Sequence, residues 1–150
     1  MTLREPDTFR YAGNGEVIPL RFRRDTPIVL ANINLPGREA LRAWYEIDSG
    51  CDGALCLGHD FVKSNRLEQV LGSNHASKRT GVGGSVATRV GRLPQFQLGD
   101  QKLDDVAVNC FSTGSPVDAD LAGHIGLGVL RQFKVIFDYS RRQMILEPLK

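Results

Sequence analysis

The amino-acid sequence predicts an all-β domain that folds as a closed or partly closed barrel with one or two short helices. The first observation behind this prediction is that apolar and polar residues alternate in several short runs, as they do in strands with one buried face. The second is that turn-forming pairs, such as Pro36-Gly37 and Gly99-Asp100, separate these runs. The chain has no evident internal repeat or low-complexity segment.

Length and composition indicate a single globular domain. The chain has 150 residues, of which 41% are hydrophobic and 24% are charged, so it can bury one core of ordinary size. Its formal net charge of +2 is too small to indicate a nucleic-acid partner, and we interpret Arg21, Arg23 and Arg24 as solvated surface. No stretch approaches the roughly 20 apolar residues of a membrane span, and the first residues lack the apolar core of a signal peptide. We therefore expect a soluble chain with no nucleic-acid partner and no membrane span.

The predicted elements begin with a hairpin. Residues 27–35 alternate, and Pro36-Gly37 then suits a type II turn, because proline fixes φ at one central position and glycine accepts positive φ at the next. The second strand covers residues 41–47 and ends at Asp48. One face of this strand carries Leu41, Ala43, Tyr45 and Ile47, and the other carries Arg42, Trp44 and Glu46.

A short apolar strand at residues 54–57 and a helix over residues 64–72 are predicted next. Ser64 is a suitable N-cap, apolar residues follow at helical spacing, and Gly72 ends the pattern.

Residues 78–89 indicate a second hairpin that turns at Gly83-Gly84. Its polar residues and glycines leave too few apolar side chains to hold both faces against a core, so we expect the arm to project and move. A mobile lid and a simple solvent-exposed hairpin both fit this composition.

The rest of the chain continues the β pattern. Residues 93–98 and 103–108 flank Gly99-Asp100 as a third hairpin, and a polar loop covers residues 112–120. Residues 121–133 begin as an apolar strand and become a short helix after a glycine. Residues 134–139 and 143–148 close the chain as two strands.

Asp48-Ser49-Gly50 is the strongest chemical signal in the sequence. It directly follows the strand at residues 41–47, so packing of that strand fixes a carboxylate at its tip. The glycine allows a sharp turn and a close approach of the backbone to another group. This arrangement presents a carboxylate for acid–base chemistry, although the tripeptide alone is common by chance.

The three cysteines, Cys51, Cys56 and Cys110, are too few and too odd in number to indicate a disulfide scaffold. We expect them to remain thiols. Cys51, Cys56 and His59 have a spacing that zinc could use, but no second Cys/His pair follows at a usable spacing. Burial of Cys56 in an apolar run is the better interpretation.

Three landmarks occur in a characteristic order along the chain. They are Asp48-Ser49-Gly50, the hairpin around Gly83-Gly84, and Ile125-Gly126 followed by Leu130. Together with the ending of the chain, they make it resemble a single-lobe, retropepsin-like aspartic peptidase of the bacterial gag-type aspartyl protease branch. The resemblance covers about residues 27–148. It implies a retropepsin-like acid protease barrel with a flap hairpin at residues 27–150, preceded by residues 1–26 as an N-terminal extension or first strand.

The resemblance implies an aspartic endopeptidase that hydrolyses peptide or protein substrates. In that mechanism two carboxylates share one proton, one activating a water as general base while the other, protonated, polarises the carbonyl. The chain contains one Asp-Ser-Gly tripeptide, so the second Asp48 is expected from another copy in a homodimer, with the site on its two-fold axis. No metal or organic cofactor is implied. The alternative is a catalytically silent peptide-binding or dimerisation module with the same fold.

The resemblance also implies roles for particular residues. The implied catalytic residues are Asp48, Ser49 and Gly50, and the implied substrate-binding residues are Asp52, Val82, Gly83 and Gly84. Ordinary turn chemistry is an equal alternative for Asp52. For contacts between chains we expect the paired catalytic loops and the terminal strand at residues 143–148. Asp118 and Asp120 are the first candidates for a second acid within one chain.

Two residues depart from the family pattern. Cys51 stands where such families usually carry alanine, and it is either a redox-sensitive thiol or a small hydrophobe. His124 occupies a position where an apolar residue is common. We interpret it as a packed or surface imidazole, because the implied mechanism needs no histidine.

Overall fold

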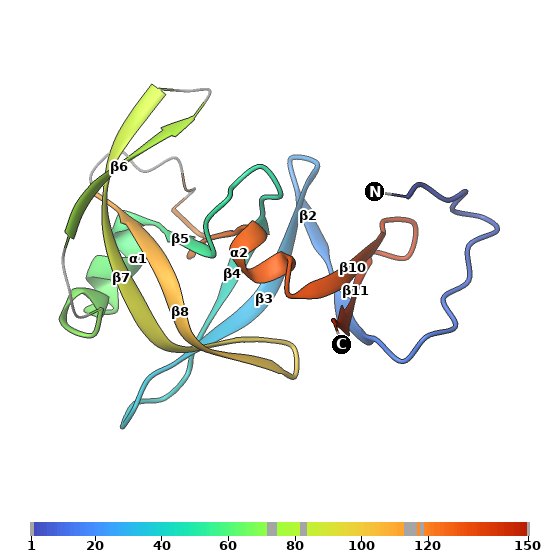
Figure 1. Cartoon of the computed structure of the whole chain (residues 1–150), viewed down its shortest axis with the longest axis horizontal. Helices are drawn as coiled ribbons and strands as arrows, with labels where there is room; N and C mark the ends of the chain where they lie inside the picture. The colour runs from blue at the N-terminus through green and yellow to red at the C-terminus, as the bar shows by residue number, and fades with distance from the viewer. Residues whose placement is uncertain (1, 72–74, 82–83, 113–116, 118, 150) are drawn as a thin grey trace.

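The computed structural model describes residues 2–71, 75–81, 84–112, 117 and 119–149. It consists of strands with two short α-helices and one 3-10 turn, as the sequence predicts (Figure 1). In chain order the elements are β1 (Glu16–Pro19), β2 (Arg21–Arg23), β3 (Thr26–Asn34), β4 (Leu41–Ile47), β5 (Leu55–Leu57), α1 (His59–Ser64), η1 (Leu67–Gln69), β6 (His75–Gly81), β7 (Gly84–Leu98), β8 (Gln101–Phe111), β9 (Gly123–Ile125), α2 (Leu127–Leu130), β10 (Phe133–Asp138) and β11 (Gln143–Pro148).

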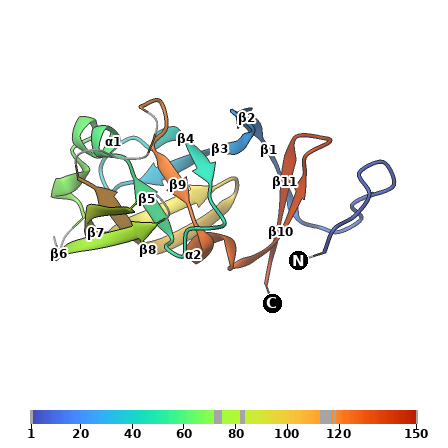
Figure 2. The same ribbon diagram turned by 90° about the horizontal axis from the view of Figure 1, so that it is seen from above.

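The strands form two sheets, and the larger one closes on itself. Its order is β2-β3-β4-β9-β5-β8-β7-β6, and an additional pairing joins β3 to β7. In that pairing Ala31 lies opposite Leu98 and Ile33 lies opposite Phe96. The ring of β3, β4, β9, β5, β8 and β7 is therefore a barrel, which confirms the predicted architecture. The smaller sheet has the order β1-β11-β10 and extends to one side of the barrel (Figure 2).

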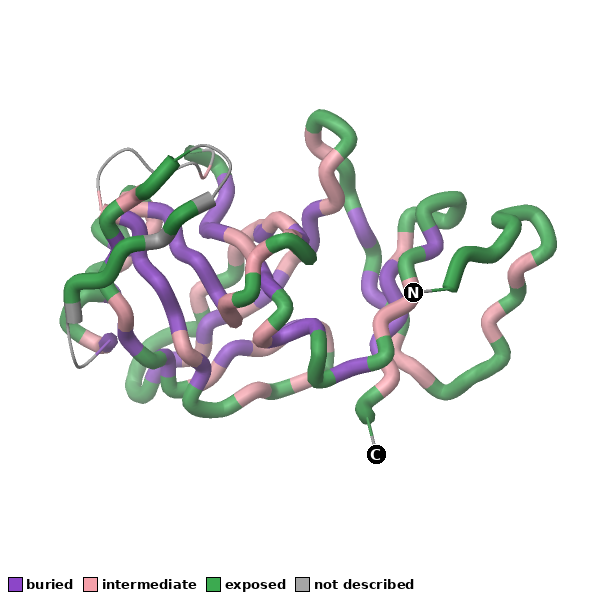
Figure 3. Tube along the Cα trace, turned by 45° about the horizontal axis from the view of Figure 1, so that its top comes forward, coloured by how far each residue is buried: buried purple, intermediate pink, exposed green. Residues whose placement is uncertain are grey.

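The core fills the barrel and continues into the smaller sheet. Buried segments follow the strands of both sheets, whereas the first residues of the chain are mostly exposed (Figure 3). Tyr45 is central because its side chain is fully buried and its ring meets Phe96 edge to face at 5.4 Å. Among the described residues the buried Tyr45 hydroxyl has no hydrogen-bond partner, so the ring rather than the hydroxyl holds this side chain in the core.

The predicted helix over residues 64–72 is wrong in its position. Helix α1 ends where that helix was expected to begin, at Ser64, and only the 3-10 turn η1 follows. Arg66 lies between them in the left-handed conformation, with φ of 52°, which interrupts any continuous helix. Val62 and Leu67 are both buried, so the chain bends to place one apolar side chain from each short element in the core.

The strand pairings of the three predicted hairpins are confirmed, and two of the hairpins share a strand. The turn predicted at Gly83-Gly84 is not confirmed, because Gly84 already belongs to β7 and Gly83 lies outside the described residues. Strand β6 pairs with β7 so that Gly81 lies opposite Gly84, and β7 continues to pair with β8 across the turn at Gly99. Gly99 has φ of +61° and Gly37 has φ of +69°, as expected for their turns. Strand β7 is therefore one continuous element that serves both hairpins. Its first part and β6 project beyond the barrel (Figure 1).

The smaller sheet corrects the expectation that residues 143–148 pair between chains. Strand β11 is the middle strand, with β1 on one side and β10 on the other, so both of its edges are already hydrogen-bonded. Its side chains Met144, Ile145 and Leu146 are fully buried within the chain. A second copy therefore cannot pair with this strand unless the sheet is opened.

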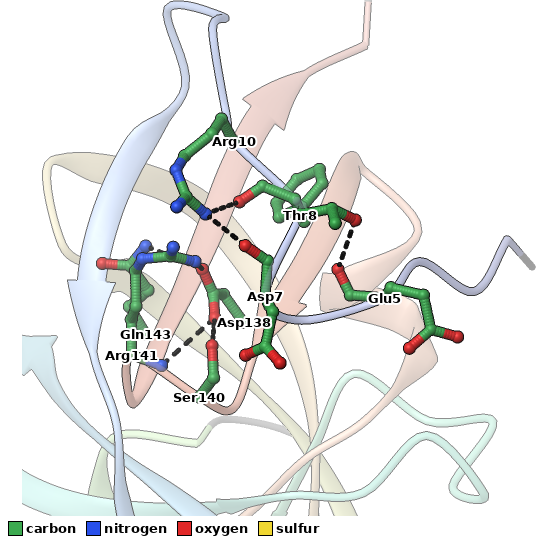
Figure 4. A network of polar contacts seen from close by, with 9 residues as sticks. Glu5, Asp7, Thr8, Arg10, Asp138, Ser140, Arg141 and Gln143 are labelled. Atoms are coloured by element: carbon green, nitrogen blue, oxygen red, sulfur yellow. Dashed lines mark hydrogen bonds and ion pairs between the residues drawn. The ribbon is translucent and has the colours of Figure 1, made fainter.

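A buried carboxylate fixes the turn between β10 and β11. Asp138 accepts hydrogen bonds from the Ser140 hydroxyl at 2.7 Å and from the Arg141 backbone N–H at 3.1 Å (Figure 4). The Arg141 guanidinium adds an ion pair at 2.7 Å. Burial by itself raises the pKa of Asp138, but these bonds outweigh it and hold the pKa below its ordinary value.

Within the described part of the chain, no helix is long and apolar enough to cross a membrane.

Candidate active site

The Asp48 loop joins the ends of two strands that flank the same short strand. Strand β4 runs parallel to β9 with Ile47 opposite Ile125, and β5 runs antiparallel to β9 with Leu55 opposite the same Ile125. The loop between Ile47 and Leu55 therefore arches over the end of β9 and the start of α2. Since these isoleucines and the leucine are all buried in the core, both ends of the loop are firmly anchored.

Backbone hydrogen bonds fix the conformation at Asp48. Its N–H donates to the Ile125 carbonyl at 3.0 Å, and its carbonyl accepts from the Cys51 N–H at 3.2 Å. One carboxylate oxygen, Oδ1, accepts the Gly50 N–H at 2.9 Å. The Asp48 side chain remains 38% exposed. The loop thus presents an oriented carboxylate to solvent at the tip of β4, where the sequence predicted it.

The start of α2 holds the far side of the loop. The Cys51 carbonyl accepts the Leu127 N–H at 2.7 Å, and the Gly53 carbonyl accepts the Gly128 N–H at 2.9 Å. A Cβ on Gly126 would lie 2.4 Å from the Gly53 oxygen and 2.7 Å from the Cys51 oxygen. Glycine is therefore required at position 126 by close approach of the loop backbone. This close approach explains why a glycine follows Ile125 in the motif found in the sequence.

His124 is a packed imidazole, one of the two environments expected from the sequence, and it lies near Asp48. Its Nδ1 lies 3.9 Å from Asp48 Oδ2, and its Nε2 lies 3.8 Å from Glu46 Oε2. The His124 side chain is only 14% exposed, and its ring also meets Phe111 edge to face. When protonated, this imidazole lies within ion-pair distance of two carboxylates. The sequence contained one signal for this cluster. Glu46 and Asp48 are two residues apart, so the alternation of the strand places both carboxylates on the same face.

Glu46, His124 and Cys56 form one row across three neighbouring strands. The register places His124 opposite Glu46 on one side and opposite Cys56 on the other. Cys56 Sγ lies 3.5 Å from Cys51 Sγ, so the row continues into the Asp48 loop. The described cysteines are all thiols rather than disulfides. No described group of three or more His, Cys, Asp or Glu side chains has a metal-binding arrangement.

The remaining predicted site residues are placed as follows. Ser49 and Asp52 are exposed in the Asp48 loop. Gly84 is exposed at the start of β7, with φ of +108°, whereas Val82 and Gly83 lie outside the described residues. In Figure 1 the end of β6, the start of β7 and the Asp48 loop between β4 and β5 all lie in the upper half of the view.

A cavity of about 220 Å³ lies at the base of that hairpin and not at Asp48. It lies between α1, η1 and the β7–β8 pair, and its lining includes His59, Glu68, Arg89 and Cys110. Asp48 is not among the residues that line this cavity, and the Asp48 side chain is exposed to solvent in the loop that the sequence predicted.

Comparison with solved structures identifies the fold. The crystal structure of a retropepsin-like aspartic protease from Rickettsia conorii superposes with a TM-score of 0.61 and 16% sequence identity, covering 91% of this chain and 96% of that chain. At this identity the likeness establishes the fold, which is retropepsin-like. Neither a protein-family model nor a curated protein sequence matches the chain.

Proposed function

We propose that this protein is an aspartic endopeptidase whose active site is completed by a second copy of the chain. The observation that carries the proposal is the Asp48 carboxylate, oriented by the Gly50 N–H at the tip of β4 and still 38% exposed, in a chain with a retropepsin-like fold. An exposed and oriented carboxylate is what activation of a water molecule requires.

The proposed mechanism needs two carboxylates that share one proton. The ionised Asp48 removes a proton from a water molecule, which attacks the peptide carbonyl, while the protonated Asp48 of the other copy donates a hydrogen bond to the carbonyl oxygen. The peptide C–N bond then breaks, and the leaving amine takes up a proton. Asp120, considered as a second acid within one chain, is ion-paired with Arg23 instead. Asp118 lies outside the described residues.

The surroundings of Gly50 support approach of a second loop. A Cβ built on Gly50 would meet only Asp48 Oδ1, at 3.2 Å, so the space beyond it is open. We assign Ser49 to a hydrogen bond across the two-fold axis and Gly50 to close contact between the two loops. Asp52 and the hairpin tip at Val82, Gly83 and Gly84 are assigned to substrate contacts, with the hairpin acting as a flap.

The test is cleavage of casein between acidic and neutral pH, with and without pepstatin. We expect pepstatin-sensitive cleavage by the wild type and none by Asp48→Asn, because asparagine keeps the shape of the side chain but cannot accept the proton of the water. Asp104→Asn is the matched control, since Asp104 is an exposed carboxylate on β8 that accepts a bond from Gln95, which asparagine can also do. Circular dichroism checks that both variants fold.

Two outcomes would contradict the proposal. Metal-independent cleavage by purified Asp48→Asn would exclude the aspartic mechanism. Peptide binding without hydrolysis by the wild type would instead identify the silent binding module.

A further inference from the structure

We propose that Cys51 and Cys56 are a site of oxidative modification, at which a disulfide forms and displaces the loop that carries Asp48. The two sulfurs lie 3.5 Å apart, with Cys51 in the catalytic loop and Cys56 in β5. The effect on activity rests on the proposed peptidase function, whereas formation of the disulfide does not.

The two thiols differ in access and in rigidity. Cys56 is 3% exposed and lies in the middle of β5, which pairs with β8 on one side and β9 on the other. Cys51 is partly exposed and lies outside any regular element. An oxidant therefore reaches Cys51 first, and Cys51 is also the residue that can move.

The chemistry balances with hydrogen peroxide as the oxidant. The Cys51 thiol loses its proton, the thiolate attacks one peroxide oxygen, and the O–O bond breaks to give sulfenic acid and hydroxide. The hydroxide takes up the proton that the thiol lost, which gives the first water. The Cys56 sulfur then attacks the Cys51 sulfur, the S–S bond forms as the S–O bond breaks, and the released hydroxide takes the Cys56 proton to give a second water. The two thiols lose two electrons, and the peroxide gains them.

Formation of the disulfide between Cys51 and Cys56 changes the geometry around Asp48. A disulfide bond is about 2.05 Å long, so the sulfurs must approach by about 1.5 Å from their present separation. Because Cys56 is held by strands on both sides, most of this movement falls on Cys51. The Cys51 N–H donates to the Asp48 carbonyl, and the Cys51 carbonyl accepts the Leu127 N–H. Movement of Cys51 therefore alters the turn that orients the Asp48 carboxylate.

Cys110 provides an internal reference within the same molecule. It is 5% exposed, and burial raises the pKa of its thiol to about 12, so it carries little reactive thiolate near neutral pH. We expect it to stay reduced under peroxide concentrations that oxidise Cys51.

Formation of the Cys51–Cys56 disulfide is tested by mass spectrometry of tryptic peptides after peroxide treatment. Trypsin cleavage after Arg42 and Lys63 releases residues 43–63 with Cys51 and Cys56, and places Cys110 on a separate peptide. We expect peptide 43–63 to become lighter by two hydrogen atoms and to resist alkylation until dithiothreitol is added. Cys51→Ser should abolish this change, and Cys110→Ser should leave it intact.

The functional consequence is tested by activity and by NMR. Peroxide should lower the activity of the wild type and of Cys110→Ser by about 100-fold, because a misplacement of about 1 Å is that costly. Dithiothreitol should restore this activity, and peroxide should not lower the activity of Cys51→Ser. Backbone amide signals of residues 48–52 report the displacement of the loop whether or not the protein cleaves casein.

Each result decides a separate part of the proposal. If both thiols of peptide 43–63 remain open to alkylation, or if Cys51 goes only to sulfinic acid, the disulfide is refuted. If the disulfide forms while the loop signals and activity are unchanged, its coupling to Asp48 is refuted. A reduced wild type that cleaves nothing refutes the proposed peptidase function and leaves the mass and NMR results to decide the disulfide.

Discussion

Substitution of Gly126→Ala tests how closely α2 holds the Asp48 loop. The backbone at Gly126 has φ of −103°, which alanine adopts without strain, so only the added methyl group matters. That Cβ would lie 2.4 Å from the Gly53 oxygen and 2.7 Å from the Cys51 oxygen. Both contacts are with backbone, so no side-chain rotation relieves them.

The expected effect can be worked from these distances. Ordinary contact begins near 3.4 Å, so the Gly53 oxygen must move by about 1 Å relative to position 126. Under the proposed function, a displacement of that size passed on to Asp48 costs about 100-fold in rate, or about 2.7 kcal/mol of activation free energy. Overpacking should also lower the free energy of unfolding by about 1–3 kcal/mol. We therefore expect a large loss of kcat and a modest fall in Tm, at about 2–4 °C per kcal/mol.

Gly91→Ala is the matched control for this prediction. Its Cβ would lie 2.7 Å from the Leu71 Cβ and 2.8 Å from the Leu71 oxygen, a similar clash that involves no residue of the Asp48 loop. It should lower Tm comparably and leave kcat within about twofold of the wild type. Casein cleavage well below both Tm values provides the comparison. The reasoning is refuted if Gly126→Ala keeps wild-type kcat, or if both variants lose it equally.

Three further predictions follow from other parts of the structure. Tyr45→Phe should raise the free energy of unfolding by about 1 kcal/mol in denaturant titrations, because it removes a buried hydroxyl that finds no partner in the described part of the chain. Asp138→Asn should destabilise the protein most near neutral pH and progressively less below pH 3.8. The lowered pKa means that the ionised carboxylate stabilises the fold above its ordinary pKa and loses this effect as the pH falls through the folded value. Specific activity should decline on dilution in parallel with dissociation seen by analytical ultracentrifugation, because each chain supplies one Asp48.

Each of these three predictions has an outcome that would contradict it. A destabilised Tyr45→Phe would mean that the hydroxyl has a partner in solution. A constant stability difference for Asp138→Asn from acidic to neutral pH would remove the carboxylate from the pH dependence. Full activity from a demonstrated monomer would refute a site shared between two chains.

Local pattern alone was sufficient for most strands and for the Asp48 turn. Strand β4 spans Leu41–Ile47, the bounds that its alternation predicted, because side chains on a strand point to opposite faces with a period of two. The turns at Gly37 and Gly99 were equally readable, since positive φ selects glycine. The fold class followed from the number of such strands and turns.

The helix between β5 and β6 shows where local pattern fails. Residues 64–72 carry a plausible cap, spacing and stop, yet α1 ends at Ser64. Burial of Val62 and Leu67 decided the position, with Arg66 taking a left-handed conformation to allow it. Tertiary packing overrides a weak helical propensity in so short a segment.

The sequence by itself determined an all-β chain with an anchored Asp-Ser-Gly turn. Only the tertiary structure decided what surrounds that turn, because β9 inserts between β4 and β5 although it lies far along the chain from both. That insertion brings His124 to Asp48 and fixes Cys56 beside Cys51. It was likewise the pairing of β1 with β11 that made the last strand internal. Alternation records which face of a strand is buried but not which strand lies beside it, so these contacts could not be read from the sequence.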